Sequence, residues 1–352
     1  MLFPLVSTEV DAALPAAIAT AGGTDRLNAT ARDFLDVVAA ALPGAPRVAD
    51  HAHRRPDPAA VRALSPATRR RIIRTAIALN VLTEQPDAAD HARIAAAAAD
   101  LDVAEPAVDV IAALAAGTVP LTLVHTVEFD AYRTPVPRDL ALLPAYARFL
   151  AMHLPPAAIH GTLASPELAA QFAPLHHLPA DTAGRTFADF YAAHDWRLPG
   201  VPGAVALPLT LHDWLHVYIG ATTEPLGEVE VGAFAAGTTR HPYGFHNLLI
   251  VLLMFEHGMV DAMNGGPGLA PAGAGAARPL SRERARGITG NPAGGAMVAD
   301  AFLRGTATNT DLYLGVDHLG RADTPLAELR EEYAIPARGT YAAALTPALG
   351  RA

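Results

Sequence analysis

The sequence predicts an all-α protein, and three features of its composition support this fold class. Hydrophobic residues make up 51% of the chain, alanine supplies much of that share, and β-branched residues are sparse outside short runs. Both features favour helices over sheets. The 30 prolines and 28 glycines must then lie mainly between helices, because proline disrupts a helix interior. We therefore expect many short helices joined by turns rich in proline and glycine.

The chain of 352 residues is long enough for two helical domains, and a change in amino-acid composition places the division after residue 117. In the first domain, 1–117, Ser65-Pro66 marks a helix start, since serine is a preferred cap and proline is favoured at the first helical position. The second domain, 118–352, carries more aromatic residues, more histidines and longer loops. The helices expected in the first domain cover 24–43, 66–79, 87–101 and 105–116.

The first domain contains an alanine-rich run at 94–103, and its last three expected helices are closely spaced. In these two features it resembles the tellurite-resistance TerB-like helical fold. In the second domain, Pro199–Pro208 is expected to be a linker and Gly265–Ala277 a mobile loop. Helical segments are expected there at 138–153, 165–172, 182–194, 209–237 (the metal-binding segment), 244–262 and 295–333.

Two residue types are missing from the chain, and their absence excludes several kinds of chemistry. There is no cysteine, which excludes disulfides, thiolate nucleophiles, iron–sulfur ligation and cysteine zinc sites. There is no lysine either, because all 26 basic residues are arginine. This excludes a Schiff-base lysine and a Walker-type phosphate loop. Proton transfer must therefore use His, Asp, Glu, Tyr or a metal-bound water, since arginine stays protonated near neutral pH.

The charge of the chain argues against nucleic acid as a partner. The net charge is −9, and the nearest basic cluster, Arg69 to Arg71 with Arg74, is expected to be a solvated helix face. Residues 1–6 lack the basic start of a signal peptide. The most apolar window, Leu248–Phe255, is far shorter than the roughly 18 to 20 residues that cross a bilayer. We expect a soluble, cytoplasmic protein, and peripheral contact with a membrane stays open.

One segment has the pattern of a metal site. His212 and His216 are four residues apart, so on a helix both imidazoles lie on one face and can bind one ion. Asp213 lies about 100° round the helix, where it can act as a further ligand or orient a ligating histidine. Gly220 should end this helix. Glu228, twelve positions after His216, can then complete the coordination from the next helix.

Two imidazoles and one or two carboxylates favour zinc, with iron(II), manganese and cobalt as alternatives. Without a thiolate, the site is harder than a structural zinc finger, which favours an open position for water or substrate. Asp213 and Glu228 are also the candidate catalytic residues, because either can accept a proton. The competing interpretation is a pair of ordinary histidines. A peptidase is disfavoured, because the His-Glu-x-x-His pattern has glutamate where this chain has the shorter Asp213.

The motif His-Asp-x-x-His, followed by eleven residues and Glu228, resembles the signature of the coenzyme Q biosynthesis protein 4 family. The chain departs from the family at Ala221, where an aromatic residue is common, and at His318, near which tryptophan is expected. These departures put the exact substrate in doubt. Other parts of the chain also resemble the family, and they occur along the chain in the same order as in the family. They are Thr182–Phe190, Val231–Phe234, Ala301–Gly305, Asp317 and Thr324–Glu332.

The resemblance implies an all-helical, zinc-binding protein of ubiquinone biosynthesis that binds isoprenoid quinone precursors. It predicts a lyase acting on a prenylated or otherwise lipophilic aromatic, by decarboxylation or oxidative decarboxylation of the ring carboxylate. The segment Leu248–Phe255 is then a candidate lining for a prenyl chain, or a plain core helix. It also implies membership of a biosynthetic protein complex, and apolar helix faces favour a homodimer.

Two alternatives to this function stay open. One is a non-catalytic lipid-binding scaffold of a quinone-biosynthesis complex. The other is recruitment of a family member to a secondary-metabolite pathway with a different aromatic substrate. Elsewhere, His51, His53, His176 and His177 are expected to be exposed loop histidines. Arg304 can hold an anion or form a structural ion pair.

Overall fold

The computed structural model describes residues 7–41, 56–83, 86–117, 165–202, 204, 207–239, 241–257 and 288–345. In these ranges, extended pairing is limited to an isolated bridge between Thr182 and Pro325, and the all-α prediction is confirmed. The α-helices are α1 (Ser7–Thr20), α2 (Ala29–Ala41), α4 (Pro58–Ala63), α5 (Pro66–Val81), α6 (Ala88–Asp100), α7 (Val108–Ala115), α11 (Pro166–Phe172), α12 (Ala183–Ala193), α13 (Leu207–Ile219), α14 (Pro225–Thr238), α15 (Tyr243–Phe255), α18 (Gly294–Ala307) and α19 (Leu326–Glu332). Short 3₁₀ helices are η1 (Thr24–Arg26), η2 (Ala173–His177) and η3 (Ala342–Leu345).

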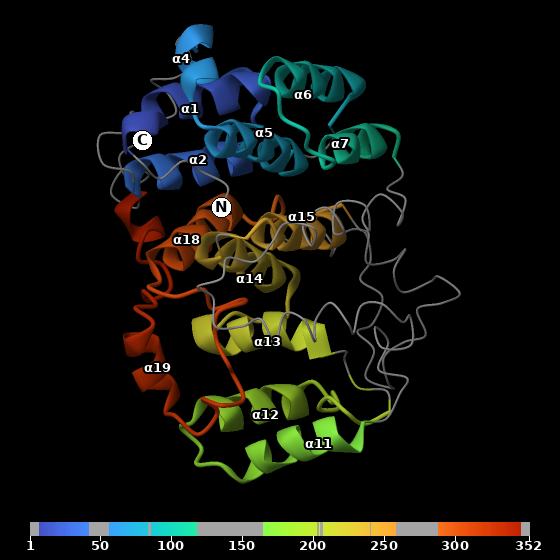
Figure 1. Cartoon of the computed structure of the whole chain (residues 1–352), viewed down its shortest axis with the longest axis vertical. Helices are drawn as coiled ribbons and strands as arrows, with labels where there is room; N and C mark the ends of the chain where they lie inside the picture. Colours follow the sequence, from blue (N-terminus) through green and yellow to red (C-terminus); the bar gives the residue numbers. More distant parts are fainter. Residues whose placement is uncertain are drawn as a thin grey trace.

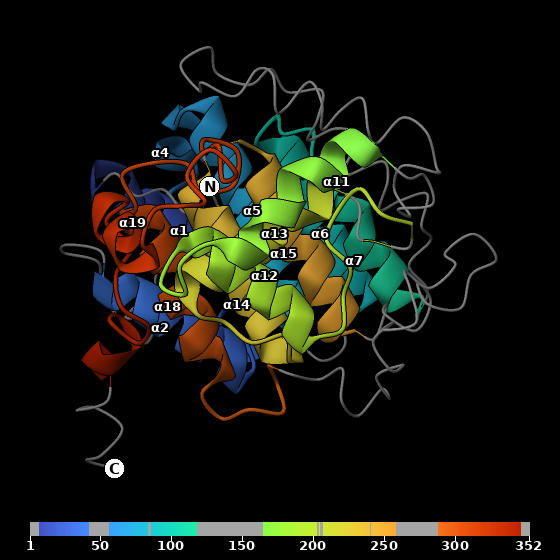
Figure 2. The same cartoon turned by 90° about the horizontal axis from the view of Figure 1, so that it is seen from below.

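The helices are stacked in layers along the long axis of the molecule (Figure 1). The helices α1, α2 and α4 to α7 form one end, and α14, α15 and α18 form the next layer. Helix α13 lies below that layer, and α11 and α12 form the opposite end, with α19 beside α12 and α13. Seen from that end, α12 and α13 lie over α14 and α15 (Figure 2). Helix α13, the predicted metal helix, is therefore covered on both faces.

The helix starts follow local capping chemistry. The Ser65 side chain accepts a hydrogen bond from the backbone of Thr68, with Pro66 at the first position of α5. Helix α6 begins with a capping box in which Asp87 and Asp90 each bind the other's backbone N–H. The helices α1 and α4 are not among the elements predicted from the sequence. A proline lies inside α1, and α4 is a short helix in a proline-bearing stretch, so neither gives a clear periodic pattern.

Several predicted boundaries change in the second half of the chain. The expected linker ends early, because Leu207 and Pro208 already belong to the first turn of α13, where proline is tolerated. Helix α15 ends at Phe255, and the carboxylate of Glu256 accepts from the backbone N–H of Ile288. The expected terminal region contains two helices, α18 and α19, separated by a non-helical segment. The predictions for 138–153 and 265–277 lie outside the described residues.

Helices on both sides of residue 117 share one hydrophobic core. Helix α2 packs on α18, and α5 packs on α15. The rings of Phe34 and Phe302 are 6.4 Å apart, and the guanidinium of Arg74 lies 5.0 Å from the centre of the Phe245 ring. The division into two domains stays a prediction. In the structure, buried side chains from both parts form one continuous cluster.

Glycines allow α14 to approach its neighbours closely. A Cβ atom on Gly237 would lie 2.1 Å from the carbonyl oxygen of Phe302, and one on Gly305 would lie 2.3 Å from that of Phe234. The two glycines therefore face each other where α14 crosses α18. On the α15 side, a Cβ on Gly232 would lie 2.3 Å from a methyl group of Val251. Larger side chains at these positions would separate the helices that carry and support the predicted site.

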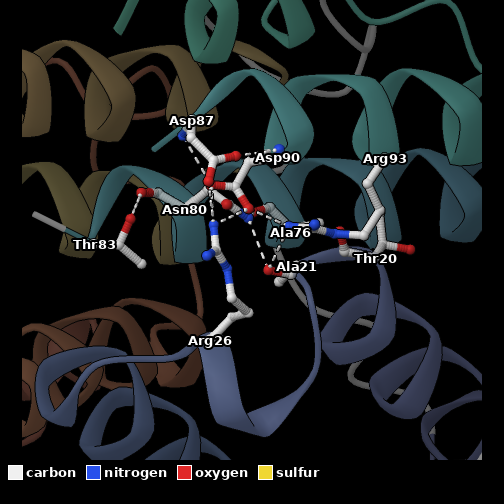
Figure 3. A network of polar contacts seen from close by, with 9 residues as sticks. All are labelled: Thr20, Ala21, Arg26, Ala76, Asn80, Thr83, Asp87, Asp90 and Arg93. Atoms are coloured by element: carbon white, nitrogen blue, oxygen red, sulfur yellow. Dashed lines mark hydrogen bonds and ion pairs between the residues drawn. The ribbon is translucent and has the colours of Figure 1, made fainter. Parts of the chain in front are cut away.

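Polar contacts tie the N-terminal helices together (Figure 3). The buried carboxylate of Asp90 accepts hydrogen bonds from Arg26, at 3.0 Å, and from Arg93. Arg93 also donates to the carbonyl of Thr20, at the end of α1. Asn80 of α5 donates to Ala21 at 3.4 Å. The network joins α1, η1, α5 and α6.

The arginine run at the start of α5 binds the loop between α6 and α7. Arg69 donates to the carbonyl of Leu101, and Arg70 donates to that of Ala104 at 3.0 Å. Arg74 is buried and pairs with Glu105 at 2.6 Å. The prediction of a solvated face is wrong for Arg74, which is buried, whereas Arg69 and Arg70 bind carbonyls and stay partly exposed. Among the described helices, none is long and apolar enough to span a bilayer.

Candidate metal centre

The structure brings His212 and His216 of α13 together with Glu228 from the first turn of α14. The Nε2 atom of His212 lies 2.9 Å from Oε2 of Glu228 and 3.2 Å from Nε2 of His216. The Nε2 atom of His216 lies 3.5 Å from the same oxygen. These three residues, which we call the metal group, form the one cluster of at least three potential ligand residues found in the described part of the chain.

The spacing of the metal group fits a single zinc-sized ion. Ligand atoms about 2.0 to 2.1 Å from a tetrahedral ion lie about 3.3 Å from one another. The three separations, 2.9, 3.2 and 3.5 Å, bracket this value. Two imidazole nitrogens and a carboxylate oxygen are also a donor set that zinc accepts with an open fourth position. The residues therefore fit the predicted metal, with only small side-chain adjustments.

Exposure is uneven across the metal group. The side chain of His216 is 1% exposed, whereas those of His212 and Glu228 are 14% and 15% exposed. An ion between them would be closed off on the His216 side and accessible on the other. A water molecule or a substrate atom would therefore approach the ion from the side of His212 and Glu228.

The end of α13 fixes the orientation of the His216 ring. Gly220 has a φ of +69° and donates its N–H to the carbonyl of His216 at 2.9 Å. This left-handed turn brings the carbonyl of Ala221 to 3.2 Å from Nδ1 of His216. A carbonyl only accepts, so Nδ1 must carry the hydrogen. The lone pair of the neutral ring is then on Nε2, the atom that faces the other two ligands.

Asp213 does not join the metal group. Its Oδ2 atom accepts a hydrogen bond from the hydroxyl of Tyr191, on α12, at 2.5 Å. Of the four ligands predicted from the sequence, the structure brings together three and points the fourth towards another helix. The reason is the helical rotation between His212 and its neighbour Asp213, which directs the carboxylate to α12 while His212 faces α14.

The charges of the site are strongly coupled. Burial would raise the pKa of Glu228, but hydrogen bonds from His212 and His216 outweigh it and lower the pKa to about 2. Burial would likewise lower the pKa of His216, but the Glu228 carboxylate raises it. For Asp213, burial dominates and raises the pKa despite the nearby imidazoles and Tyr191. The two carboxylates therefore differ, because Glu228 is the weaker base and Asp213 the stronger.

Aromatic side chains of α12 support α13. Phe190 stacks on His216, with ring centres 5.4 Å apart and an angle of 24°. Phe187 stacks on Trp214 at 4.1 Å, and His318 covers the same indole at 5.4 Å. Burial lowers the pKa of His318 to about 4, so its ring is neutral and packs as an aromatic group.

The C-terminal segments also reach α13. Arg330 of α19 donates to the carbonyls of Tyr218 and Val217, at 2.8 and 3.0 Å. Arg304 of α18 donates to Ile219 at 3.4 Å and to Pro336 at 2.9 Å. Both arginines therefore bind backbone carbonyls, and for Arg304 these hydrogen bonds differ from the ion pair and the anion site that the sequence analysis considered. The segments Thr182–Phe190, Ala301–Gly305 and Thr324–Glu332, which are far apart in the sequence, thus all lie around the metal helix.

The remaining histidine predictions separate into two groups. His176 and His177 are exposed at η2, as expected. His51 and His53 lie outside the described residues. The sequence analysis did not identify Tyr191, Ala221 or Arg330 as parts of the site. Each of the three had a partial signal in the sequence: Tyr191 directly follows the segment Thr182–Phe190, Arg330 lies within Thr324–Glu332, and Ala221 is a departure from the family pattern, but none of these signals gave the residue a role.

The fold and the site define an all-helical protein with a candidate three-residue metal centre between two packed helices. Comparison with known protein families and with curated proteins finds no match to this chain.

Proposed function

We propose that this protein is a metal-dependent enzyme that removes the ring carboxylate of a prenylated or otherwise lipophilic aromatic quinone precursor. The observation that carries the proposal is the metal group, whose three donor atoms have the spacing of ligands to one ion and an accessible side. Zinc is the favoured ion, with iron(II), manganese and cobalt as alternatives. The substrate class comes from the resemblance of the quoted segments to the coenzyme Q biosynthesis protein 4 family.

In this proposal, His212, His216 and Glu228 hold the ion. A divalent ion there supplies positive charge that stabilises negative charge on a phenol or carboxylate oxygen beside it. Ala221 keeps His216 in the tautomer that leaves Nε2 free to bind. Glu228 serves as a ligand, because its Oε2 atom lies 2.9 Å from Nε2 of His212 and 3.5 Å from Nε2 of His216. Asp213 is the better candidate for accepting a proton, since its pKa is raised.

Two forms of the reaction are compatible with this site. In simple decarboxylation, carbon dioxide leaves and a proton takes its place on the ring carbon. In the oxidative form, an oxygen atom takes that place, and dioxygen or another oxidant must be supplied. We also propose two kinds of protein partner. The family resemblance favours membership of a biosynthetic protein complex, and the apolar helix faces favour a homodimer.

Metal content and turnover test the proposal. We expect about one equivalent of zinc, cobalt or iron per chain after loading, and its loss in His212→Ala and His216→Ala. His177→Ala is the matched control, because it removes an exposed histidine outside the metal group. The loaded protein should release carbon dioxide from a prenylated hydroxybenzoate, assayed with and without dioxygen. A chain that takes up none of these metals would refute the metal centre, and a loaded but inactive one would refute the reaction.

A lipid-binding scaffold is the second candidate, and one observation favours it. The contact between His212 and Glu228 already joins α13 to α14 through side chains, so an ion there could serve only to hold the helices together. A metal-free His216→Ala variant that still binds prenylated lipid and its protein complex would favour the scaffold. Turnover of another aromatic, with none of the prenylated one, would favour recruitment to a secondary-metabolite pathway.

A further inference from the structure

We infer that Tyr191 keeps the fourth position of the metal centre open by holding the carboxylate of Asp213 away from the ion. The inference rests on the proposed metal centre. It assigns a positioning role to a residue of α12 that contacts none of the three ligand atoms. It also gives a physical reason why Asp213, which the sequence leaves open as a metal ligand, points to α12 instead of the ion.

Asp213 is the carboxylate best placed to become a fourth ligand. It is the next residue after His212 in α13, so a change in its side-chain rotamer is the smallest movement that brings a second carboxylate towards the ion. In the structure, the side chain points instead to α12, where Oδ2 accepts from the hydroxyl of Tyr191 at 2.5 Å. A short hydrogen bond to a charged acceptor is among the stronger ones in proteins.

The surroundings of Tyr191 hold its hydroxyl in place. The residue is fully buried, and its ring packs against Phe187 at 4.6 Å and edge-on against Trp196 at 5.8 Å. Because the ring is fixed, the hydroxyl cannot follow the carboxylate if the carboxylate turns towards α14. Asp213 itself is 8% exposed, so little water can replace the tyrosine as its donor. In the outward position the buried carboxylate therefore keeps a hydrogen-bond donor.

The consequence concerns the type of metal site. Three protein ligands leave a position for water or substrate, which is the arrangement of catalytic zinc. Four protein ligands close the ion, which is the arrangement of structural zinc. Without the hydroxyl of residue 191, the buried carboxylate of Asp213 loses its donor, and the ion becomes the nearest favourable partner. One oxygen atom on α12 thus determines whether the centre can accept an exogenous ligand.

The test uses the full chain loaded with cobalt(II), whose visible spectrum reports the coordination, and azide as the exogenous ligand. In the wild type, azide should bind to cobalt at the position that no protein ligand occupies, and the visible bands should shift. In Tyr191→Phe, Asp213 should occupy that position. Azide should then bind at least about tenfold more weakly, and a chelator should remove cobalt at least about tenfold more slowly.

Tyr218→Phe is the matched control. It removes the hydroxyl of another buried tyrosine, whose partner is Nδ1 of His318 at 3.1 Å, and it leaves Asp213 untouched. Its azide affinity and cobalt spectrum should equal those of the wild type. The double variant Tyr191→Phe with Asp213→Asn should recover azide binding, because a neutral amide is a poor ligand.

Asp213→Asn in the wild-type background gives an independent test if Tyr191→Phe does not fold. We expect its cobalt spectrum to match that of the wild type, because Asp213 is not a ligand. Three results would each overturn the inference. They are a changed cobalt spectrum in Asp213→Asn, an azide affinity of folded Tyr191→Phe equal to that of the wild type, and a cobalt-loaded wild type that does not bind azide. Failure of the wild type to take up cobalt would instead reject the metal centre.

Discussion

Replacement of Glu228 by glutamine tests how strongly charge stabilises the metal group before any ion binds. Glu228→Gln keeps the shape of the side chain and removes its charge. In the folded protein, the pKa of Glu228 is about 2, compared with an ordinary value of 4.5. The difference of 2.5 (4.5 − 2) corresponds to an upper limit of about 3 kcal/mol in the free energy of unfolding.

This contribution depends on pH at both ends. The pKa of Glu228 is lowered in the folded state, so its contribution is complete above pH 4.5 and is lost as the pH falls towards 2. Although burial opposes it, Glu228 raises the pKa of His216 above 6.5. The stability gained by that pairing is complete below pH 6.5 and is lost as the pH rises through the folded pKa. The metal-free protein therefore gains most from the pair between pH 4.5 and 6.5.

The assay is urea unfolding of the wild type and Glu228→Gln with a chelator present, at about pH 5.5 and about pH 9. At the lower pH, Glu228→Gln should be less stable by up to about 3 kcal/mol, and the difference should shrink at the higher pH. Glu331→Gln, at an exposed position, is the control and should change stability by less than about 0.5 kcal/mol. Equal differences at the two pH values would refute the argument, because packing alone does not depend on the protonation of His216.

Three further predictions concern the supports of the metal helix. Gly220→Ala should lower the free energy of unfolding by about 1 kcal/mol, because the backbone at Gly220 is left-handed, a conformation that alanine disfavours. The added methyl group itself has room. Unchanged stability would contradict this prediction. Arg330→Met should cost about 2 kcal/mol through the loss of two hydrogen bonds to α13 carbonyls, measured by thermal unfolding. The control is Arg321→Met, whose ion pair with Glu332 is well exposed and worth less than about 1 kcal/mol, so equal effects would reject the role of Arg330. Gly305→Ala should cost at least about 2 kcal/mol in urea unfolding, because its Cβ would lie 2.3 Å from a carbonyl of α14, and a neutral effect would mean that α14 and α18 can separate freely.

Local rules were enough to predict the parts of the fold that depend on neighbouring residues. Helix starts such as that of α5 follow from Ser65 and Pro66, because the cap and the first turn are only a few residues apart. The shared face of His212 and His216 follows from the helical repeat alone. Boundaries were less certain where proline lies within a helix, as in the first turn of α13, since the sequence signal for a break and for a helix start is the same.

The sequence by itself determined the helical class, the exclusion of thiolate and lysine chemistry, and the pair of imidazoles on one helix face. The tertiary structure decided which helix faces that pair, and so brought Glu228 to His212 while turning Asp213 towards Tyr191. It also placed the guanidinium of Arg330 on the end of the metal helix. The physical reason is that periodicity fixes the direction of a side chain only relative to its own helix. Its partner is fixed by packing between helices that are far apart in the chain.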